Sequence, residues 1–200
     1  MEHITEKNSQ STEEQNKIGI VKKYIPFAWE VLKIFIIASV IVLPIRYFLF
    51  QPFIVKGESM MPNFQQGDYL IVDEISYRFK SPERGDIIVF KYPKDTSQKF
   101  IKRIIGLPGE TVEIKDGKVI IYKDQKSFTL DEKYLSGPSE TIGTLKLILL
   151  ADEYFVLGDN REFSYDSRVW GSVQTKNIIG KVFLRVLPVT NLTKITLPSY

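Results

Sequence analysis

Hydrophobic and polar residues follow three different patterns along the chain, with the first change near residue 25. Residues 1–18 are polar, carry four acidic and two basic residues and show no periodicity, which is typical of disorder. A largely hydrophobic stretch follows from about Phe27 to Phe50, with large apolar side chains all round the helix it would form. From Gln51 onward, short runs alternate apolar and polar residues, which indicates half-buried β-strands.

The hydrophobic stretch favours a membrane-spanning helix over a buried helix of a soluble domain. Its uncharged part has only twelve residues, Ile34 to Ile45, which is short for a hydrocarbon layer of roughly 30 Å. The longer span reaches the required length but includes Glu30, Lys33 and Arg46. Lys33 and Arg46 lie near its two ends, where long side chains extend to the polar interface. A cleaved signal peptide fits less well, because the preceding polar region is long and no small-x-small site follows.

Basic residues flank this span unequally, with Lys17, Lys22 and Lys23 before it and Arg46 and Lys56 after it. The bias favours a cytoplasmic N-terminus, so the domain that follows the span is expected on the outer face of the cell membrane. We expect a disordered cytoplasmic tail over residues 1–24, a single transmembrane anchor over 25–50 and an extracytoplasmic β-rich domain over 51–200.

The outer domain is expected to be mainly β. The candidate strands are PFIVKG, DYLIVDEI, DIIVFKYP, KFIKRIIG, TVEIK, KVIIYK, EYFVLGD and GKVFLRVLPV. Asp116-Gly117 joins TVEIK to KVIIYK, and this is the strongest hairpin signal in the chain. The segment from Ser127 to Leu150 is less regular, with SGPSETIGT predicted as a loop and TLKLILL as a strand. Many short strands joined by Gly, Pro and Asp turns predict antiparallel sheets in a barrel-like or sandwich arrangement.

Composition excludes several classes of function. The chain has no cysteine and one histidine, His3, which lies in the polar leader. Cysteine proteases are excluded, a Ser-His-Asp hydrolase would need His3 to fold back, and zinc sites built from His and Cys have too few ligands. Net charge is +3 without a basic stripe interleaved with aromatic residues, so we expect no nucleic-acid partner. No metal site or cofactor is expected, and a nucleophilic serine would need a lysine or a carboxylate as its base.

The first candidate segment is GESMMPNF, residues 57–64, in which Gly57 and Pro62 frame Ser59. Gly57 permits unusual backbone angles and Pro62 stiffens the chain beyond the serine. An ordinary turn is the plain interpretation, and a presented nucleophile is the alternative.

Lys102 is the candidate base, in the apolar run FIKRIIGLPGE. A lysine in water has a pKa of about 10.4, whereas a base must be neutral. Desolvation among neighbours such as Phe100 and Ile101 would lower that pKa, and reaching about 8 would cost roughly 3 kcal/mol. The plain alternative is a lysine on the solvent side of a strand.

A third segment, GDNREFSYDSRVWG at residues 158–171, is dense in polar groups although it follows an apolar strand. Its first residues suit a tight turn, and Asp166 and Arg168 are placed to form a charge-assisted pair. A surface loop explains the turn, but it explains less well why Ser164 and Ser167 lie so close to this pair.

Together these segments resemble type I signal peptidases, membrane-anchored serine proteases that remove signal peptides from exported proteins. GESMMPN resembles the nucleophile box of that family, RGDIIVF a structural box, KRIIGLPGE the lysine box and GDNREFSYDSR the last box. The four segments occur in the family's order, and with the anchor segment they span from about residue 30 to residue 185. The short segment between the last two boxes is more similar to Gram-positive members.

The resemblance implies a serine–lysine dyad, with Ser59 attacking the scissile carbonyl and Lys102 acting as general base. It implies that a last-box serine hydrogen-bonds the lysine amine, and Ser164 matches that position. It also implies orienting roles for three further residues: Asp159, Asp166 and Arg168.

Two departures from the family pattern affect these expectations. Asn63-Phe64 stands where members usually have Thr-Leu, and the larger Phe64 is expected to narrow the substrate pocket. Gly57 stands where some members have a serine that holds the oxyanion, so the backbone N–H of Ser59 is the expected donor.

The implied substrates are signal peptides with Ala-x-Ala-like sites, bound as an added strand at a sheet edge. The expected pocket residues are Phe53 and Val55 before Ser59, Phe100 and Ile101 before Lys102, and Phe64 in the nucleophile segment. The second expected partner is the lipid bilayer.

A self-cleaving repressor protease would carry a DNA-binding domain where this chain has a hydrophobic span. A non-catalytic membrane-anchored homologue acting as a binding protein is the remaining alternative, although such a protein would be expected to lose Ser59 or Lys102.

Overall fold

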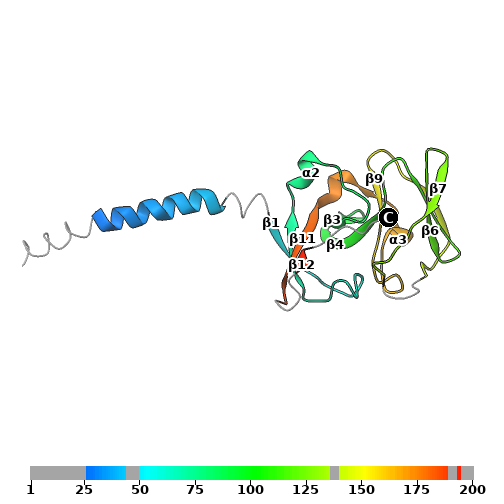
Figure 1. The fold of residues 1–200 in the computed structure, drawn as a ribbon, viewed down its shortest axis with the longest axis horizontal. Coiled ribbons are helices and arrows are strands. Elements are labelled where there is room, and N and C mark those ends of the chain that lie inside the picture. Colours follow the sequence, from blue (N-terminus) through cyan, green and yellow to red (C-terminus); the bar gives the residue numbers. More distant parts are fainter. Residues whose placement is uncertain (1–25, 44–49, 136–139, 189–192, 195–200) are drawn as a thin grey trace, which may run out of the picture. The chain divides into compact units, whose positions relative to one another are not determined.

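The computed structural model describes residues 26–43, 50–135, 140–188 and 193–194 (Figure 1). The chain divides into two units, Met1–Tyr47 and Phe48–Tyr200. The expected tail of residues 1–24 lies outside the described residues, as do the lysines before the span and Arg46 after it. The disorder of the tail and the orientation of the span therefore stay predictions.

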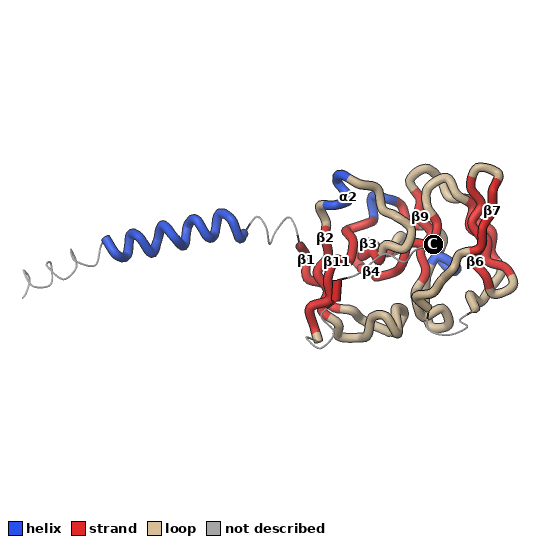
Figure 2. The backbone as a smooth tube through the Cα atoms, viewed as in Figure 1, coloured by secondary structure: helices blue, strands red, loops and turns tan. Residues whose placement is uncertain are grey.

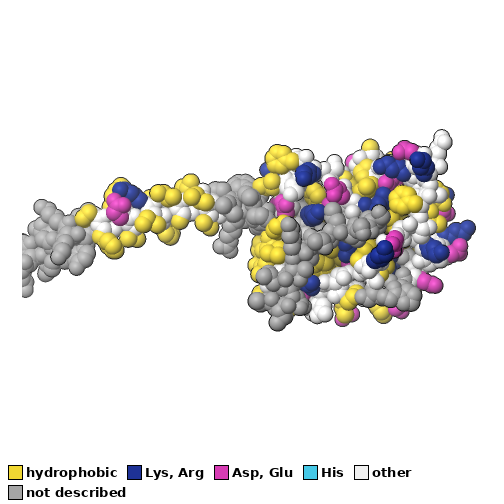
Figure 3. Space-filling view, in the orientation of Figure 1, with side chains coloured by type: hydrophobic (Ala, Val, Ile, Leu, Met, Phe, Trp, Pro, Cys, Tyr) yellow, Lys and Arg dark blue, Asp and Glu magenta, His cyan; other side chains and the backbone are white. Residues whose placement is uncertain are grey.

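The first unit contains one described helix, Pro26–Leu43, which is long and apolar enough to cross a membrane. Its 18 residues extend roughly 27 Å at 1.5 Å per residue. Hydrophobic side chains cover the visible face of this helix, interrupted by one pair of opposite charges (Figure 3). The pair is Lys33 and Glu30, whose Nζ and Oε1 atoms lie 2.8 Å apart one turn along the helix. The two charged residues of the helix Pro26–Leu43 therefore neutralise each other.

The second unit is built from antiparallel strands, which dominate it in Figure 2. The strands of its larger sheet are β1 (Phe50–Ile54), β2 (Tyr69–Asp73), β3 (Ile87–Tyr92), β4 (Asp95–Gly106), β9 (Glu153–Leu157), β10 (Val173–Gln174), β11 (Ile178–Leu187) and β12 (Thr193–Lys194). The strands of its smaller sheet are β5 (Thr111–Lys115), β6 (Lys118–Lys123), β7 (Lys126–Thr129) and β8 (Leu145–Ile148). The strand orders are β1-β2-β11-β3-β4-β9-β10, with β12 beside β11, and β7-β6-β5-β8.

The prediction of a mainly β fold behind one N-terminal apolar helix is confirmed, although the described strands form two sheets and no closed barrel. The hairpin TVEIK–KVIIYK matches β5 and β6 residue for residue. Asp116 and Gly117 both have positive φ, 50° and 73°, as a tight two-residue connection requires. The sequence patterns missed the edge strand β7, the short β10 and β12, and three one-turn helices: α2 (Ser76–Phe79), α3 (Ser167–Trp170) and η2 (Thr175–Asn177).

Apolar residues gather into separate clusters that hold these sheets in place. One cluster joins the two sheets, because Ile105 and Phe155 of the larger sheet pack with Val112 and Ile121 of the smaller one. Figure 1 accordingly places β9 between the β3–β4 pair and the β6–β7 pair. A second cluster lies under the loop between β1 and β2 and includes Met60 and other buried residues: Val55, Phe64, Leu70, Val72, Ile87, Val89, Ile101 and Val182.

The cluster between the sheets gives a stability prediction with a matched control in the same sheet. Ile121 is fully buried in β6, whereas Ile148 in β8 is 71% exposed. We expect Ile121→Ala to lower the free energy of unfolding by about 2–5 kcal/mol, because it removes buried methylene groups and leaves a cavity. Ile148→Ala should change it by less than about 0.5 kcal/mol. Urea unfolding of the full chain in detergent measures both, and equal losses would show that the sheets do not pack through Ile121.

Candidate active site

Ser59 lies in the loop between β1 and β2, and this loop is fastened to the core on both sides of it. Met60 is fully buried directly after the serine, and Phe64 is also buried in the cluster beneath the loop. The Met61 N–H donates to Glu58 O at 3.0 Å and the Phe64 N–H to Met60 O at 2.9 Å. Ser59 itself is half-buried, so a rigid turn presents its hydroxyl group at a partly open surface.

Lys102 reaches the same point from the middle of β4. Its Nζ donates to Ser59 Oγ at 2.7 Å and to Ile101 O at 3.0 Å. The side chain is buried, and this burial lowers the pKa of Lys102 from 10.5 to about 8, although the nearby charges of Asp166 and Asp159 act in the opposite direction. The structure therefore brings the two predicted dyad residues into hydrogen-bond contact.

The loop after β9 packs directly against the serine. A Cβ atom at Gly158 would overlap with Ser59 O and Ser164 Oγ, so only glycine allows this approach. The Asn160 N–H donates to Ser59 O at 3.0 Å, and Asn160 Nδ2 donates to Glu58 O at 3.1 Å. The loop after β9 thus fixes the backbone carbonyl groups of Glu58 and Ser59 by hydrogen bonds.

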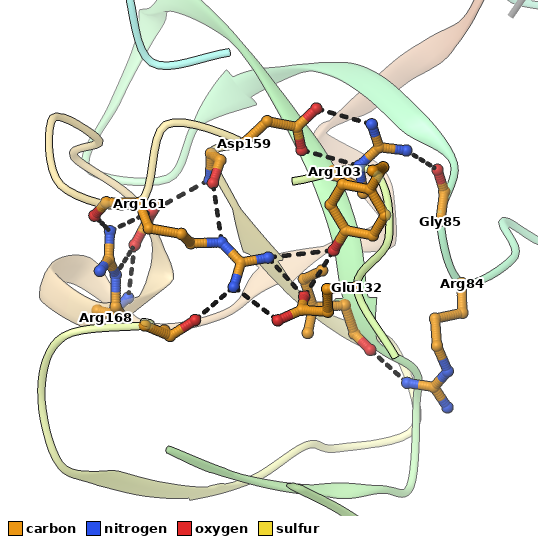
Figure 4. Close-up of polar contacts among 12 residues, drawn as sticks. Arg84, Gly85, Arg103, Glu132, Asp159, Arg161 and Arg168 are labelled. Carbon is orange, nitrogen blue, oxygen red and sulfur yellow. Dashed lines mark hydrogen bonds and ion pairs between the residues drawn. The ribbon is translucent and has the colours of Figure 1, made fainter. Parts of the chain in front are cut away.

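Asp159 forms a buried ion pair with Arg103, the residue next to Lys102 (Figure 4). The pair is bidentate, with Arg103 Nε 2.8 Å from Asp159 Oδ1 and Arg103 Nη2 2.7 Å from Asp159 Oδ2. Asn63 Nδ2 donates to the same Oδ2 atom at 2.8 Å. Asp159 therefore connects three segments that are distant in sequence.

Asp166 and Arg168 form the ion pair that the sequence suggested. Arg168 Nε and Nη2 lie 2.8 Å and 2.9 Å from the two Asp166 carboxylate oxygens, and Asp166 also accepts from the Gly158 N–H at 3.1 Å. Arg168 Nη2 donates further to Arg161 O at 2.7 Å. This pair shapes the loop that leads to Ser164.

Ser164 lies beside Gly158, with its Oγ atom buried and without a hydrogen-bond partner among the described residues. The bond to the Lys102 amine that the resemblance implies is not formed in this structure. The supporting role of Ser164 stays a prediction.

Three further residues hold the site together without having been singled out in the sequence: Arg161, Glu132 and Tyr134. Arg161 pairs with Glu132, with Nη1 2.8 Å from Oε2, and donates to Tyr134 OH at 3.1 Å (Figure 4). The Arg103 guanidinium lies 4.0 Å from the Tyr134 ring centroid. Glu132 and Tyr134 belong to the irregular segment after β7, which carried no motif that could have marked them. Arg103 was included in the segment around Lys102 but was assigned no role from the sequence.

A groove of about 550 Å³ opens beside the Ser59–Lys102 contact. Its walls come from the two strands that lead to the dyad and from the dyad itself: Phe53, Ile54, Lys56, Ser59, residues 97–101 and Lys102. The predicted pocket residues Phe53, Phe100 and Ile101 line it. Val55 and Phe64 are buried in the core cluster beneath and are not among its lining residues, so their role as pocket residues stays a prediction.

Metal ligands are not gathered at this site. Within residues 26–43, 50–135, 140–188 and 193–194, no group of three or more His, Cys, Asp or Glu side chains is placed to hold a metal ion. The chemistry available here consists of a hydroxyl, an amine of lowered pKa and the backbone N–H groups around them.

Known proteins are similar to this sequence over most of its length. The family model described as signal peptidase, peptidase S26, matches residues 28–187. Probable signal peptidase I-1 of Synechocystis sp. is 40% identical over 176 residues, which cover 82% of this chain and 87% of that protein. Signal peptidase I V of Bacillus subtilis is 36% identical over 156 residues, covering 74% of this chain and 92% of that protein. A solved signal peptidase I from Enterococcus faecalis is 35% identical with a TM-score of 0.44, covering 52% of this chain and 97% of that one.

These proteins are named as peptidases, so the alternative of a non-catalytic binding protein is not supported. The family match covers more than half of the chain, and the relative from Synechocystis matches it over most of both lengths. The chain belongs to the signal peptidase family, peptidase S26.

Proposed function

We propose that this chain cleaves signal peptides from exported preproteins at Ala-x-Ala-like sites, with Ser59 as nucleophile and Lys102 as general base. The observation that carries the proposal is the 2.7 Å contact between Ser59 Oγ and the buried Lys102 Nζ. Burial brings the pKa of Lys102 to about 8, so a useful fraction of the amine is neutral near physiological pH. The names of the related proteins agree with this activity.

The same contact supports each proton transfer of an acyl-enzyme mechanism. Neutral Lys102 accepts the Ser59 proton as Oγ attacks the scissile carbonyl, and the tetrahedral intermediate then expels the amine. The Lys102 ammonium gives this proton to the leaving amine, and the acyl part of the substrate remains as an ester on Ser59. Lys102 next takes a proton from a water molecule that attacks the ester, and it returns the proton to Ser59 Oγ as the acid product leaves.

The negative oxygen of each tetrahedral intermediate needs hydrogen-bond donors. The Ser59 N–H has no hydrogen-bond partner among the described residues, so it is free to donate to this oxygen. A backbone donor held in a rigid turn is already oriented and loses no reorganisation energy when the charge develops. This donor would replace the side-chain hydroxyl that Gly57 cannot supply.

The supporting residues act through the backbone and through charge balance. Asp159 anchors Arg103 beside Lys102, and Asp166 with Arg168 shapes the loop that carries Ser164. Ser164 Oγ is buried near Gly158 without a hydrogen-bond partner among the described residues, and its role would be to hydrogen-bond and orient the lysine amine.

The groove suits an extended peptide. Among the described strands, β1 pairs only with β2, and the part of β4 before Arg103 pairs only with β3. Their free edges carry the residues that line the groove, so a peptide there can form backbone hydrogen bonds as an added strand. Alternate side chains of that strand would enter small apolar pockets near Phe53 and Ile101, which suits alanine at the first and third positions before the cut.

The helix Pro26–Leu43 would anchor the enzyme in the cell membrane, with the N-terminus in the cytoplasm and the catalytic unit outside. Signal peptides are themselves membrane-inserted, so a shared bilayer raises the effective concentration of substrate at the dyad. Exported preproteins and the lipid bilayer are then the two partners.

The dyad predicts which side chains cleavage requires. Ser59→Ala and Lys102→Met should each lower kcat/KM for an Ala-x-Ala preprotein by at least roughly 10³-fold, because nucleophile and base act as one unit. Wild-type kcat/KM should rise as pH passes about 8, where Lys102 loses its proton. The purified chain in detergent is assayed across pH, with the exposed Lys91→Met as control. Cleavage by Lys102→Met at the wild-type rate would mean that another residue is the base.

The groove predicts how substrate preference changes. We compare kcat/KM for a substrate with valine before the cut with kcat/KM for one with alanine there. Phe53→Ala should raise this valine-to-alanine ratio about tenfold, because a difference of one or two methylene groups in an apolar pocket changes kcat/KM by about that factor. Phe79→Ala is the matched control, because Phe79 is 82% exposed and outside the groove. An unchanged preference in Phe53→Ala would show that this side chain lines no specificity pocket.

A further inference from the structure

Asn63 lies four residues after Ser59 and joins the nucleophile loop to three other segments. Its Nδ2 donates to Asp159 Oδ2 at 2.8 Å and to Tyr134 O at 3.0 Å. Its backbone carbonyl accepts from Arg185 Nη1 of β11 at 2.9 Å. A carboxylate and a backbone carbonyl can only accept, so the amide must present its NH₂ group and uses both hydrogens.

These contacts link the nucleophile to the strand that carries the base. Asp159 accepts a hydrogen bond from Asn63 on Oδ2 and hydrogen bonds from Arg103 on both carboxylate oxygens. Arg103 is the neighbour of Lys102 in β4. Two overlapping hydrogen bonds close the turn that contains Ser59 and Asn63, from the Met61 N–H to Glu58 O at 3.0 Å and from the Phe64 N–H to Met60 O at 2.9 Å. A displacement of Asn63 from Asp159 would therefore move the whole turn, and Ser59 Oγ with it, relative to Lys102 Nζ.

We propose that Asn63 is a positioning residue for catalysis, one that keeps the Ser59 hydroxyl within hydrogen-bond reach of the Lys102 amine. The proposal rests on the proposed function of the dyad. Asn63 does not line the groove, so it acts on the reacting groups and not on substrate binding. An apolar residue at this position would also leave Asp159, whose side chain is fully buried, short of one donor.

The position distinguishes side chains by the number of donors they offer. Asparagine supplies two N–H groups to two acceptors, threonine one hydroxyl hydrogen, and alanine none. Catalysis should follow this order, because a misplacement of about 1 Å at reacting groups costs up to roughly 10²-fold in rate.

The test measures kcat and KM for an Ala-x-Ala preprotein with the full-length chain in detergent. Asn63→Ala should lower kcat by roughly 10–10²-fold while KM stays within about twofold, and Asn63→Thr should fall between it and the wild type. Gln66→Ala is the matched control, since Gln66 is an exposed amide in the same loop whose side chain has no hydrogen bond to another described residue. Gln66→Ala should keep the wild-type kcat.

A second control separates positioning from lost stability. Ile121→Ala removes a buried side chain from the cluster between the sheets and should keep kcat at temperatures below its unfolding midpoint, although it is destabilised. Circular dichroism shows whether Asn63→Ala folds. If it does not fold, Asn63→Thr is compared with the wild type instead, and Asn63→Thr should show a lower kcat at unchanged KM.

Each remaining outcome counts against the inference. If Asn63→Ala folds, a kcat equal to that of Gln66→Ala would overturn the inference and leave the dyad intact. If Asn63→Ala does not fold, a kcat of Asn63→Thr equal to that of the wild type would do the same. A loss confined to KM would mean that Asn63 contacts the substrate instead. Absence of cleavage by the wild type would overturn the proposed function first, and this inference together with it.

Discussion

The burial of Lys102 beside Ser59 is the interaction on which the rest of the site depends. A solvated lysine keeps its proton at neutral pH, whereas here burial lowers the pKa of Lys102 to about 8. At neutral pH this shift costs the fold roughly 3 kcal/mol, at 1.36 kcal/mol for each pKa unit. The unfolded chain holds the proton more tightly, so the cost is largest below pH 8 and disappears as pH rises through 10.5. The apolar clusters must supply that free energy.

The carboxylates near Lys102 would undo this effect if they were unpaired, because a negative charge favours the ammonium form. Each of the two is instead matched by a guanidinium group, Asp159 by Arg103 and Asp166 by Arg168. Paired in this way, they cost less to bury and can tie the loop after β9 to its neighbours. The same ion pairs thus limit the electrostatic field at the base and fix the backbone around it.

The sequence predicted those features that depend on local patterns. Alternation located the main strands, and Asp116-Gly117 located a hairpin to the residue. Ser59 and Lys102 could be selected because they stand in ordered motifs. The alternation also grouped Val55 with Phe53, and both contact the same core cluster, but Val55 is buried within it whereas Phe53 is only partly buried and also lines the groove.

Contacts between distant segments could not be predicted in this way. Arg103 and Asp159 are 56 positions apart, and Asn63 and Asp159 are 96 apart, so no periodicity connects them. Tyr134 and Glu132 lie in a segment with neither strand alternation nor a motif, and Tyr134 packs against the cluster between the two sheets. The two free strand edges beside the groove likewise follow from the order of strands in the larger sheet, which local patterns do not determine.

Direct titration of the Lys102 amine is the measurement that tests the central claim most closely. In the full chain with ¹⁵N-labelled lysine, NMR would follow the Nζ signal across pH, assigned by its absence from Lys102→Met. The buried environment predicts a midpoint of about 8. A midpoint at the ordinary lysine value of 10.5 would contradict the role of Lys102 as a base prepared by burial.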